Sequence, residues 1–94
     1  MTENKHYSEE TFTILNELRL HARPAMLLVQ SISRLDCSVL IEKEGLEADA
    51  KSIMGVLTLA AEKGSQITVR AEGPDAPKAV DAVKTLVNDK FGED

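Results

Sequence analysis

The chain has 94 residues, 43% hydrophobic and 29% charged, which fits one ordinary globular domain. Its net charge of −5 and its 3% aromatic content argue against a nucleic-acid binder, which needs a basic surface and stacking side chains. A single cysteine, Cys37, excludes an internal disulfide, and no apolar run approaches the ~20 residues of a membrane span. Since the first residues also lack an apolar signal-peptide core, we expect a cytoplasmic domain without membrane insertion.

The first strand is predicted near the N-terminus. Residues 1–8 are polar and are expected to form a flexible extension ahead of one domain that spans residues 9–94. Over residues 10–15, Phe12 and Ile14 alternate with threonines, a pattern typical of a half-buried strand.

A helix is predicted to begin within a residue or two of His21, with Pro24 in its first turn, where proline is tolerated. Its apolar stripe consists of Ala25, Leu28, Val29, Ile32 and Leu35. Met26 and Leu27 lie off this stripe. An apolar pair on the solvent side of a helix is a candidate contact surface.

Two further strands are predicted over residues 37–43 and 46–50, joined by a tight turn in which Gly45 takes a positive φ. Ser52 then caps a short helix that is predicted to run to about Ala61. That helix is apolar on nearly every side, because it contains Ile53, Met54, Val56, Leu57 and Leu59. A short surface helix cannot bury every side, so part of it should be exposed. Gly55 should weaken it by roughly 1 kcal/mol relative to alanine.

The last strand is predicted over residues 66–72, where apolar and polar residues alternate cleanly. Asp75 is a candidate N-cap for a final helix that ends at residues 90–92, and its stripe is Ala76, Ala79, Val80, Val83, Leu86 and Val87. The resulting βαββαβα order with short links favours an α+β domain. We expect a two-layer, open-faced sandwich with a four-stranded, mostly antiparallel sheet and three helices on one face.

The residues around His21 permit two interpretations. A histidine at a helix start can simply cap the helix or lie partly buried. A helix N-terminus also offers unpaired N–H groups to an anion, and Arg23 adds a guanidinium that suits phosphate oxygens. A largely neutral imidazole beside such an anion site can accept a phosphoryl group on nitrogen. The residue types alone leave both interpretations open.

Two motifs carry a family resemblance. Leu-His-Ala-Arg-Pro-Ala at residues 20–25 resembles the active-site signature of the histidine-containing phosphocarrier (HPr) family. Ala-Lys-Ser-Ile-Met-Gly-Val at residues 50–56 resembles that family's second signature, around a regulatory serine. The resemblance covers about residues 11–91 and includes the βαββαβα order. Met26 and the ending over residues 87–94 also resemble the nitrogen-related (NPr) branch of the family.

The resemblance implies a stoichiometric carrier rather than a turnover enzyme. It implies that His21 accepts a phosphoryl group on Nδ1 from enzyme I, charged by phosphoenolpyruvate, and passes it to an enzyme IIA domain. Arg23 would hold the phosphate, and Ser52 would be modified by an HPr kinase/phosphorylase. The residues that match the family's docking surface are Met26, Leu27, Ile53, Met54 and Leu57. No cofactor or metal is expected, and a carrier that shows one face to successive partners is best served as a monomer.

One position departs from the family pattern, which normally has glycine where this chain has Arg19. If that position needs a positive φ, arginine costs on the order of 1 kcal/mol there. Alternatively, Arg19 adds a second cation near the phosphate and alters the choice of partner. Ser52 also has a purely structural interpretation, as an N-cap. A phosphate there would instead add nearly two negative charges beside the apolar docking residues.

Other functions remain as alternatives. A regulatory docking protein of the same fold would use phosphorylation only as a switch, in nitrogen or carbon metabolism rather than sugar transport. A ferredoxin-like ligand-binding module shares the βαββαβ order but has no need of the residue 20–25 motif. An RNA-binding module of that order is disfavoured by the charge and the scarcity of aromatic residues.

Overall fold

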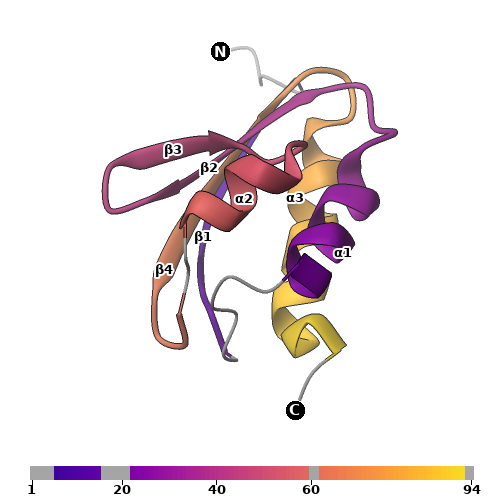
Figure 1. Cartoon of the computed structure of the whole chain (residues 1–94). Helices are drawn as coiled ribbons and strands as arrows, with labels where there is room; N and C mark the ends of the chain where they lie inside the picture. The colour runs from indigo at the N-terminus through magenta and orange to yellow at the C-terminus, as the bar shows by residue number, and fades with distance from the viewer. Residues whose placement is uncertain (1–5, 16–21, 60–61, 93–94) are drawn as a thin grey trace.

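The computed structural model describes residues 6–15, 22–59 and 62–92. Figure 1 shows a sheet with the helices packed on one side of it. The elements are β1 (Tyr7–Thr13), α1 (Ala22–Ile32), β2 (Ser38–Lys43), β3 (Leu46–Asp49), α2 (Ile53–Leu59), β4 (Gln66–Glu72) and α3 (Ala76–Asn88), followed by a short 3-10 turn (Lys90–Gly92). This is the predicted βαββαβα order.

The sheet is antiparallel throughout, with strand order β1-β4-β2-β3. The first strand begins three residues earlier than predicted, because Tyr7 pairs with Glu72 and Ser8 with Ala71. Tyr7 and Ser8 therefore belong to the sheet and not to the expected extension. The sequence did not indicate this, because the first residues of β1 are polar and gain their order from the long partner strand β4.

The hairpin between β2 and β3 matches its prediction. Lys43 pairs with Leu46, which leaves Glu44 and Gly45 as a two-residue loop. Both loop residues have positive φ, 52° for Glu44 and 83° for Gly45. Two consecutive positive φ angles are the geometry of the tight hairpin turn that suits the right-handed twist of paired strands.

One hydrophobic core fills the space between the sheet and the helices. The strand residues that face the helices are buried: Phe12, Val39, Ile41, Ile67, Val69 and Ala71. From α1 the buried stripe residues are Ala25, Leu28 and Ile32, and from α3 all of the predicted stripe is buried except Leu86, which is half-buried. The alternation of the strands and the helical spacing of α1 and α3 therefore predicted most of the core correctly. The exceptions in the α1 stripe are Val29 and Leu35, which are only half-buried, and Leu35 lies beyond the end of the helix at Ile32.

The start of α3 differs in detail from its prediction. Asp75 occupies the N-cap position, but its side chain makes no capping hydrogen bond. Its Oδ2 instead accepts from the N–H of Asp36 at 2.8 Å, which joins the turn before α3 to the loop before β2. At Gly73, which has φ +135°, a Cβ would lie 2.6 Å from Cα of Cys37, so this close approach requires glycine. Burial raises the pKa of the Cys37 thiol at this junction.

A left-handed turn follows α3. α3 stops at Asn88, and Lys90 and Phe91 both have positive φ, 52° and 53°. This left-handed pair turns the chain back on itself, so that the Phe91 ring is buried in the core. Bulky residues rarely adopt this conformation, and burial of the ring offsets the strain.

Candidate functional site

Helix α1 begins at Ala22, as predicted, and so starts directly after the candidate acceptor. His21, like Arg19 and Leu20, lies outside the described residues. Arg23 is exposed in the first turn of α1 and Pro24 is buried. The first N–H groups of a helix have no intrahelical partners, and with an exposed guanidinium they form a set of donors suited to an anion.

The off-stripe residues of α1 differ in exposure. Met26 is 43% exposed. Leu27 is only partly exposed, because its side chain packs against the core. Helical spacing predicts that both lie on the solvent side, but of the two only Met26 is exposed, and Leu27 is half-buried.

Helix α2 is capped as predicted. Ser52 Oγ accepts from the N–H of Gly55 at 3.1 Å, and the Ser52 carbonyl accepts from the N–H of Val56 at 3.0 Å. The helix ends at Leu59; the predicted end near Ala61 lies outside the described residues.

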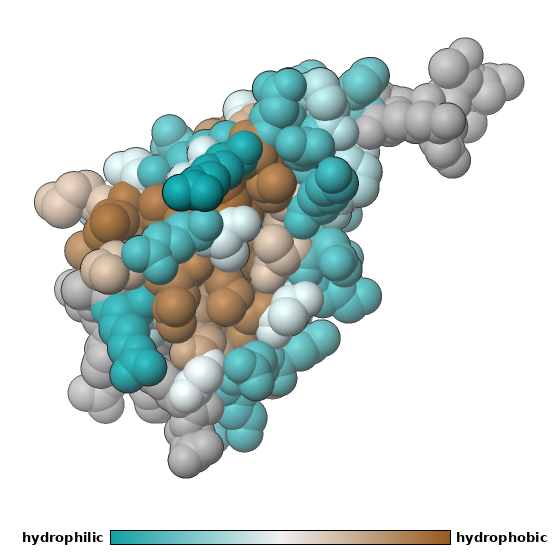
Figure 2. Space-filling model, turned by 90° about the vertical axis from the view of Figure 1, so that its right-hand side faces the viewer, coloured by the Kyte–Doolittle hydropathy of each residue, from teal (hydrophilic) through white to brown (hydrophobic). Residues whose placement is uncertain are grey.

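The predicted partial exposure of α2 is confirmed. Met54 is 71% and Ile53 38% exposed, whereas Leu57 is half-buried and Leu59 is buried. Figure 2 views the molecule from the side of α1 and α3 and shows hydrophobic surface framed by hydrophilic residues. A mixed surface of this kind, with exposed methionines, suits contact with more than one partner.

Two contacts that sequence reasoning missed hold α1 and α2 in place. Lys51 Nζ donates to the carbonyl oxygen of Leu35 at 2.7 Å and so ties the start of α2 to the segment after α1. A Cβ on Gly55 would lie 3.1 Å from the carbonyl oxygen of Asp49, so glycine lets α2 approach β3 closely. Gly55 inside a short helix is a visible signal in the sequence, but Lys51 offers none, since its acceptor is a backbone atom of another segment.

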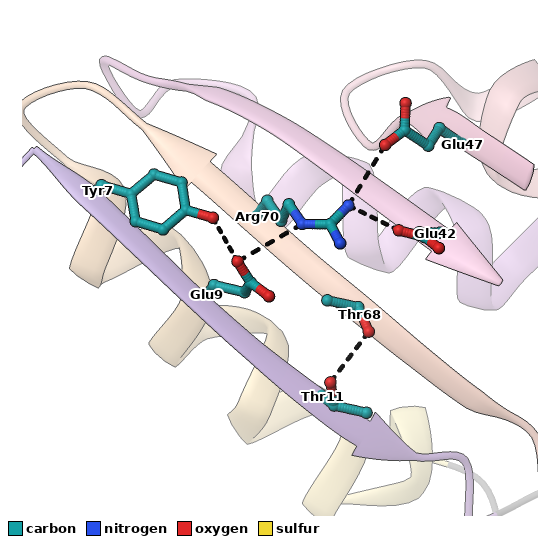
Figure 3. Close-up of polar contacts among 7 residues, drawn as sticks. All are labelled: Tyr7, Glu9, Thr11, Glu42, Glu47, Thr68 and Arg70. Carbon is teal, nitrogen blue, oxygen red and sulfur yellow. Dashed lines mark hydrogen bonds and ion pairs between the residues drawn. The ribbon is translucent and has the colours of Figure 1, made fainter. Parts of the chain in front are cut away.

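The open face of the sheet carries a network of charges (Figure 3). Arg70 on β4 lies 2.6 Å from Glu42 on β2, 3.3 Å from Glu47 on β3 and 3.5 Å from Glu9 on β1. The hydrogen bond to Glu42 is the main reason that the pKa of Arg70 is raised. The Tyr7 hydroxyl donates to Glu9. Glu42 and Glu47 are therefore both paired with Arg70.

The chain matches the sequence profile of the "PTS HPr component phosphorylation site" over residues 8–89. The chain belongs to the HPr family. It is a phosphocarrier of the phosphotransferase system and not a catalytic enzyme.

Relatives of this HPr-family chain include proteins named HPr and proteins named NPr. It is 41% identical over 85 residues to the phosphocarrier protein HPr of Treponema pallidum, covering 90% of this chain and 97% of that protein. It is 44% identical over 87 residues to the phosphocarrier protein NPr of Escherichia coli, covering 92% and 97%. The resemblance recognised in the two motifs is therefore confirmed.

Solved structures confirm the predicted HPr-like fold. HPr of Thermoanaerobacter tengcongensis aligns with a TM-score of 0.86 at 40% identity, covering 93% of this chain and 98% of that one. The catabolite repression protein Crh of Bacillus subtilis aligns with a TM-score of 0.70 at 35% identity, covering 84% and 88%. In this HPr-family protein, no helix within residues 6–15, 22–59 and 62–92 is long and apolar enough to cross a membrane.

Proposed function

We propose that His21 is the phospho-acceptor of this phosphocarrier, that Arg23 holds the phosphoryl oxygens, and that enzyme I and an enzyme IIA domain are donor and acceptor. The observation that supports this most directly is the exposed Arg23 in the first turn of α1, one residue beyond the helix start that follows His21. A phosphoryl group on the imidazole would meet the guanidinium and the first N–H groups of the helix.

Both partners would dock on the same apolar surface, formed by Met26, Leu27, Ile53, Met54 and Leu57. The exposure of Met26, Ile53 and Met54 supports this proposal, because these apolar side chains are not part of the buried core. Leu27 and Leu57 contribute through their exposed parts. Since donor and acceptor would use one surface in turn, the protein acts as a monomer in the cytoplasm, where both partners can reach it.

Ser52 would regulate docking. Its phosphorylation by an HPr kinase/phosphorylase would add nearly two negative charges directly before Ile53 and Met54. Those charges would have to be desolvated whenever a partner covers the apolar residues beside them, so partner binding weakens. The capping bond from Gly55 supports only the structural role of Ser52, which is compatible with this regulation.

A second candidate function is regulatory docking without a part in sugar transport. It is favoured by the NPr relative at 44% identity and by the Crh structures among the similar folds. The two functions share the acceptor and the docking surface and differ in the protein that receives the phosphoryl group.

The test is the intact mass of the protein after incubation with phosphoenolpyruvate and enzyme I from the same organism. We expect an acid-labile gain of one phosphoryl group in the wild type and none in His21→Ala. Arg23→Ala should be phosphorylated more slowly. Transfer onward to a sugar-specific IIA would support the transport role, and transfer only to a IIA that drives no sugar uptake would support the regulatory role. A phosphoryl group gained by His21→Ala would contradict the proposed acceptor.

A further inference from the structure

Helix α2 is too short to hold its own direction. It has seven residues, contains Gly55, and has no basic residue in its last turn. Isolated helices shorter than about 12 residues are marginal in water, and glycine weakens them further. The direction in which α2 presents Ile53 and Met54 therefore depends on contacts made by other elements.

Lys43 provides such a contact at the C-terminal end of α2. It is the last residue of β2 and alternates in step with Val39 and Ile41, which places it on the helix side of the sheet. Its Nζ donates to the carbonyl oxygen of Leu59 at 3.2 Å. The Lys43 side chain is only 18% exposed, and its ammonium lies 3.7 Å from the Glu44 carboxylate.

An ammonium group is a favourable partner for the C-terminal end of a helix. The last carbonyls of a helix have no intrahelical partners and carry a partial negative charge, so an ammonium group beside them stabilises the end of the helix. The opposite end of α2 is held by the Ser52 cap and by the close approach of Gly55 to β3. Lys43 therefore completes a pair of attachments, one at each end of the helix.

We propose that Lys43 is a positioning residue for partner docking. By holding the C-terminal end of α2 to β2, it fixes the direction of Ile53 and Met54 without offering much surface of its own. This inference rests on the proposed docking role of α2. It assigns a part in partner recognition to a side chain that is largely covered.

The test uses the full chain as acceptor from phosphorylated enzyme I, with steady-state kinetics for three variants. Lys43→Met should raise KM for this protein about three- to tenfold with kcat unchanged, the range that a charge at a helix end is worth. We expect the wild-type kcat because the substitution affects the position of α2 and not the proposed acceptor before α1. Lys43→Arg should restore most of the affinity, since a guanidinium can donate to the same carbonyl. Lys84→Met removes an exposed lysine of α3 and should leave KM unchanged.

Hydrogen exchange provides a second readout that does not require enzyme I. In Lys43→Met the amides of α2 should exchange faster, while those of β4 keep their protection. Wild-type KM and wild-type α2 exchange in Lys43→Met would overturn the inference, and so would an equal rise of KM in Lys84→Met. If the wild type accepts no phosphoryl group at all, the proposed function fails, and the exchange of α2 still decides whether Lys43 holds the helix.

Discussion

The Ser52 hydroxyl accepts the N–H of Gly55, so it already satisfies one of the unpaired donors at the start of α2. A phosphate on the same oxygen would retain acceptors for that N–H and would add charge at the positive end of the helix, which favours the helix itself. The same charge lies directly before the exposed Ile53 and Met54, where a partner must exclude water. Modification of Ser52 is therefore expected to change docking far more than stability.

Variants at Ser52 separate the two roles. Ser52→Ala removes the cap and should lower the free energy of unfolding by about 1 kcal/mol, as loss of an N-cap does. Ser52→Asp keeps a capping acceptor and should unfold within about 0.5 kcal/mol of the wild type, yet it should bind enzyme I more weakly because of its charge. Urea unfolding and titration calorimetry with enzyme I measure the two effects. Equal affinity of Ser52→Asp and the wild type would argue against regulation by charge at this position.

Local patterns predicted the features whose partners are close in sequence. The Ser52 cap and the start of α1 at Ala22, with Pro24 in its first turn, follow from residues that act on backbone groups within one helical turn. The contacts of Lys43, Lys51 and Arg70 could not be predicted in this way. Each joins a residue to another segment at least 16 positions away, and the pairing becomes visible only when the strands and helices are assembled.

Helix α2 has a low intrinsic helix propensity, yet it lies close against β3. Propensity alone indicates that Gly55 is a defect in the helix. In the structure, however, there is little space for a side chain at this position, since a Cβ would lie 3.1 Å from the Asp49 carbonyl oxygen. That oxygen also accepts the Ser52 N–H at 3.0 Å, so it is held in place and cannot easily retreat.

We therefore expect Gly55→Ala to lower the free energy of unfolding, although the same change in an open helix would raise it by about 1 kcal/mol. Gln30→Ala, at an exposed position of α1, serves as the control and should change stability by less than about 0.5 kcal/mol. Urea denaturation of both variants gives the comparison. A Gly55→Ala protein more stable than the wild type would mean that β3 yields to the added methyl group.

The C-terminal turn stores strain that one substitution should release. Lys90 has φ 52°, where a side chain costs about 1–2 kcal/mol and glycine does not. The greater freedom of glycine in the unfolded chain offsets about 0.5–1 kcal/mol of that gain. Lys90→Gly should therefore raise the free energy of unfolding by up to about 1.5 kcal/mol. Asp89→Gly, at φ −91°, has no such strain to release and should be less stable than the wild type in the same thermal unfolding measurement.

The two faces of the sheet have different chemistry. The helix side carries the core and, beyond it, the exposed apolar residues of α1 and α2. The open side carries polar cross-strand pairs such as Thr11 and Thr68, whose hydroxyls are 2.9 Å apart, and the Arg70 network (Figure 3). Because Arg70 contacts a glutamate on each of the other three strands, this one side chain joins the entire sheet. The open face is mostly polar and internally paired, although Leu40 is exposed on it, and this supports the proposal that partners bind the apolar helix side.

Tyr7 can report on this network, since it is the only tyrosine of a chain that has no tryptophan. Its hydrogen bond to Glu9 is the main reason that its pKa is raised above 10.0, and the Arg70 charge opposes that rise. We expect the absorbance of the phenolate to appear at a higher pH in the folded protein than in urea. Glu9→Gln should move the transition back towards the ordinary pH, and Arg70→Gln should move it further up.

The sign of the linked stability follows from the same shift. A phenol whose pKa is raised by folding holds its proton more tightly in the folded state, so its contribution to stability is complete below pH 10. That contribution is lost as the pH rises through the raised pKa, and Tyr7→Phe should remove this part of the alkaline destabilisation. Glu62→Gln, a change outside the Arg70 network, is the control and should leave the Tyr7 titration where it is. If Arg70→Gln lowered the pKa of Tyr7, the Arg70 guanidinium would not be acting on β1 as its distance to Glu9 indicates.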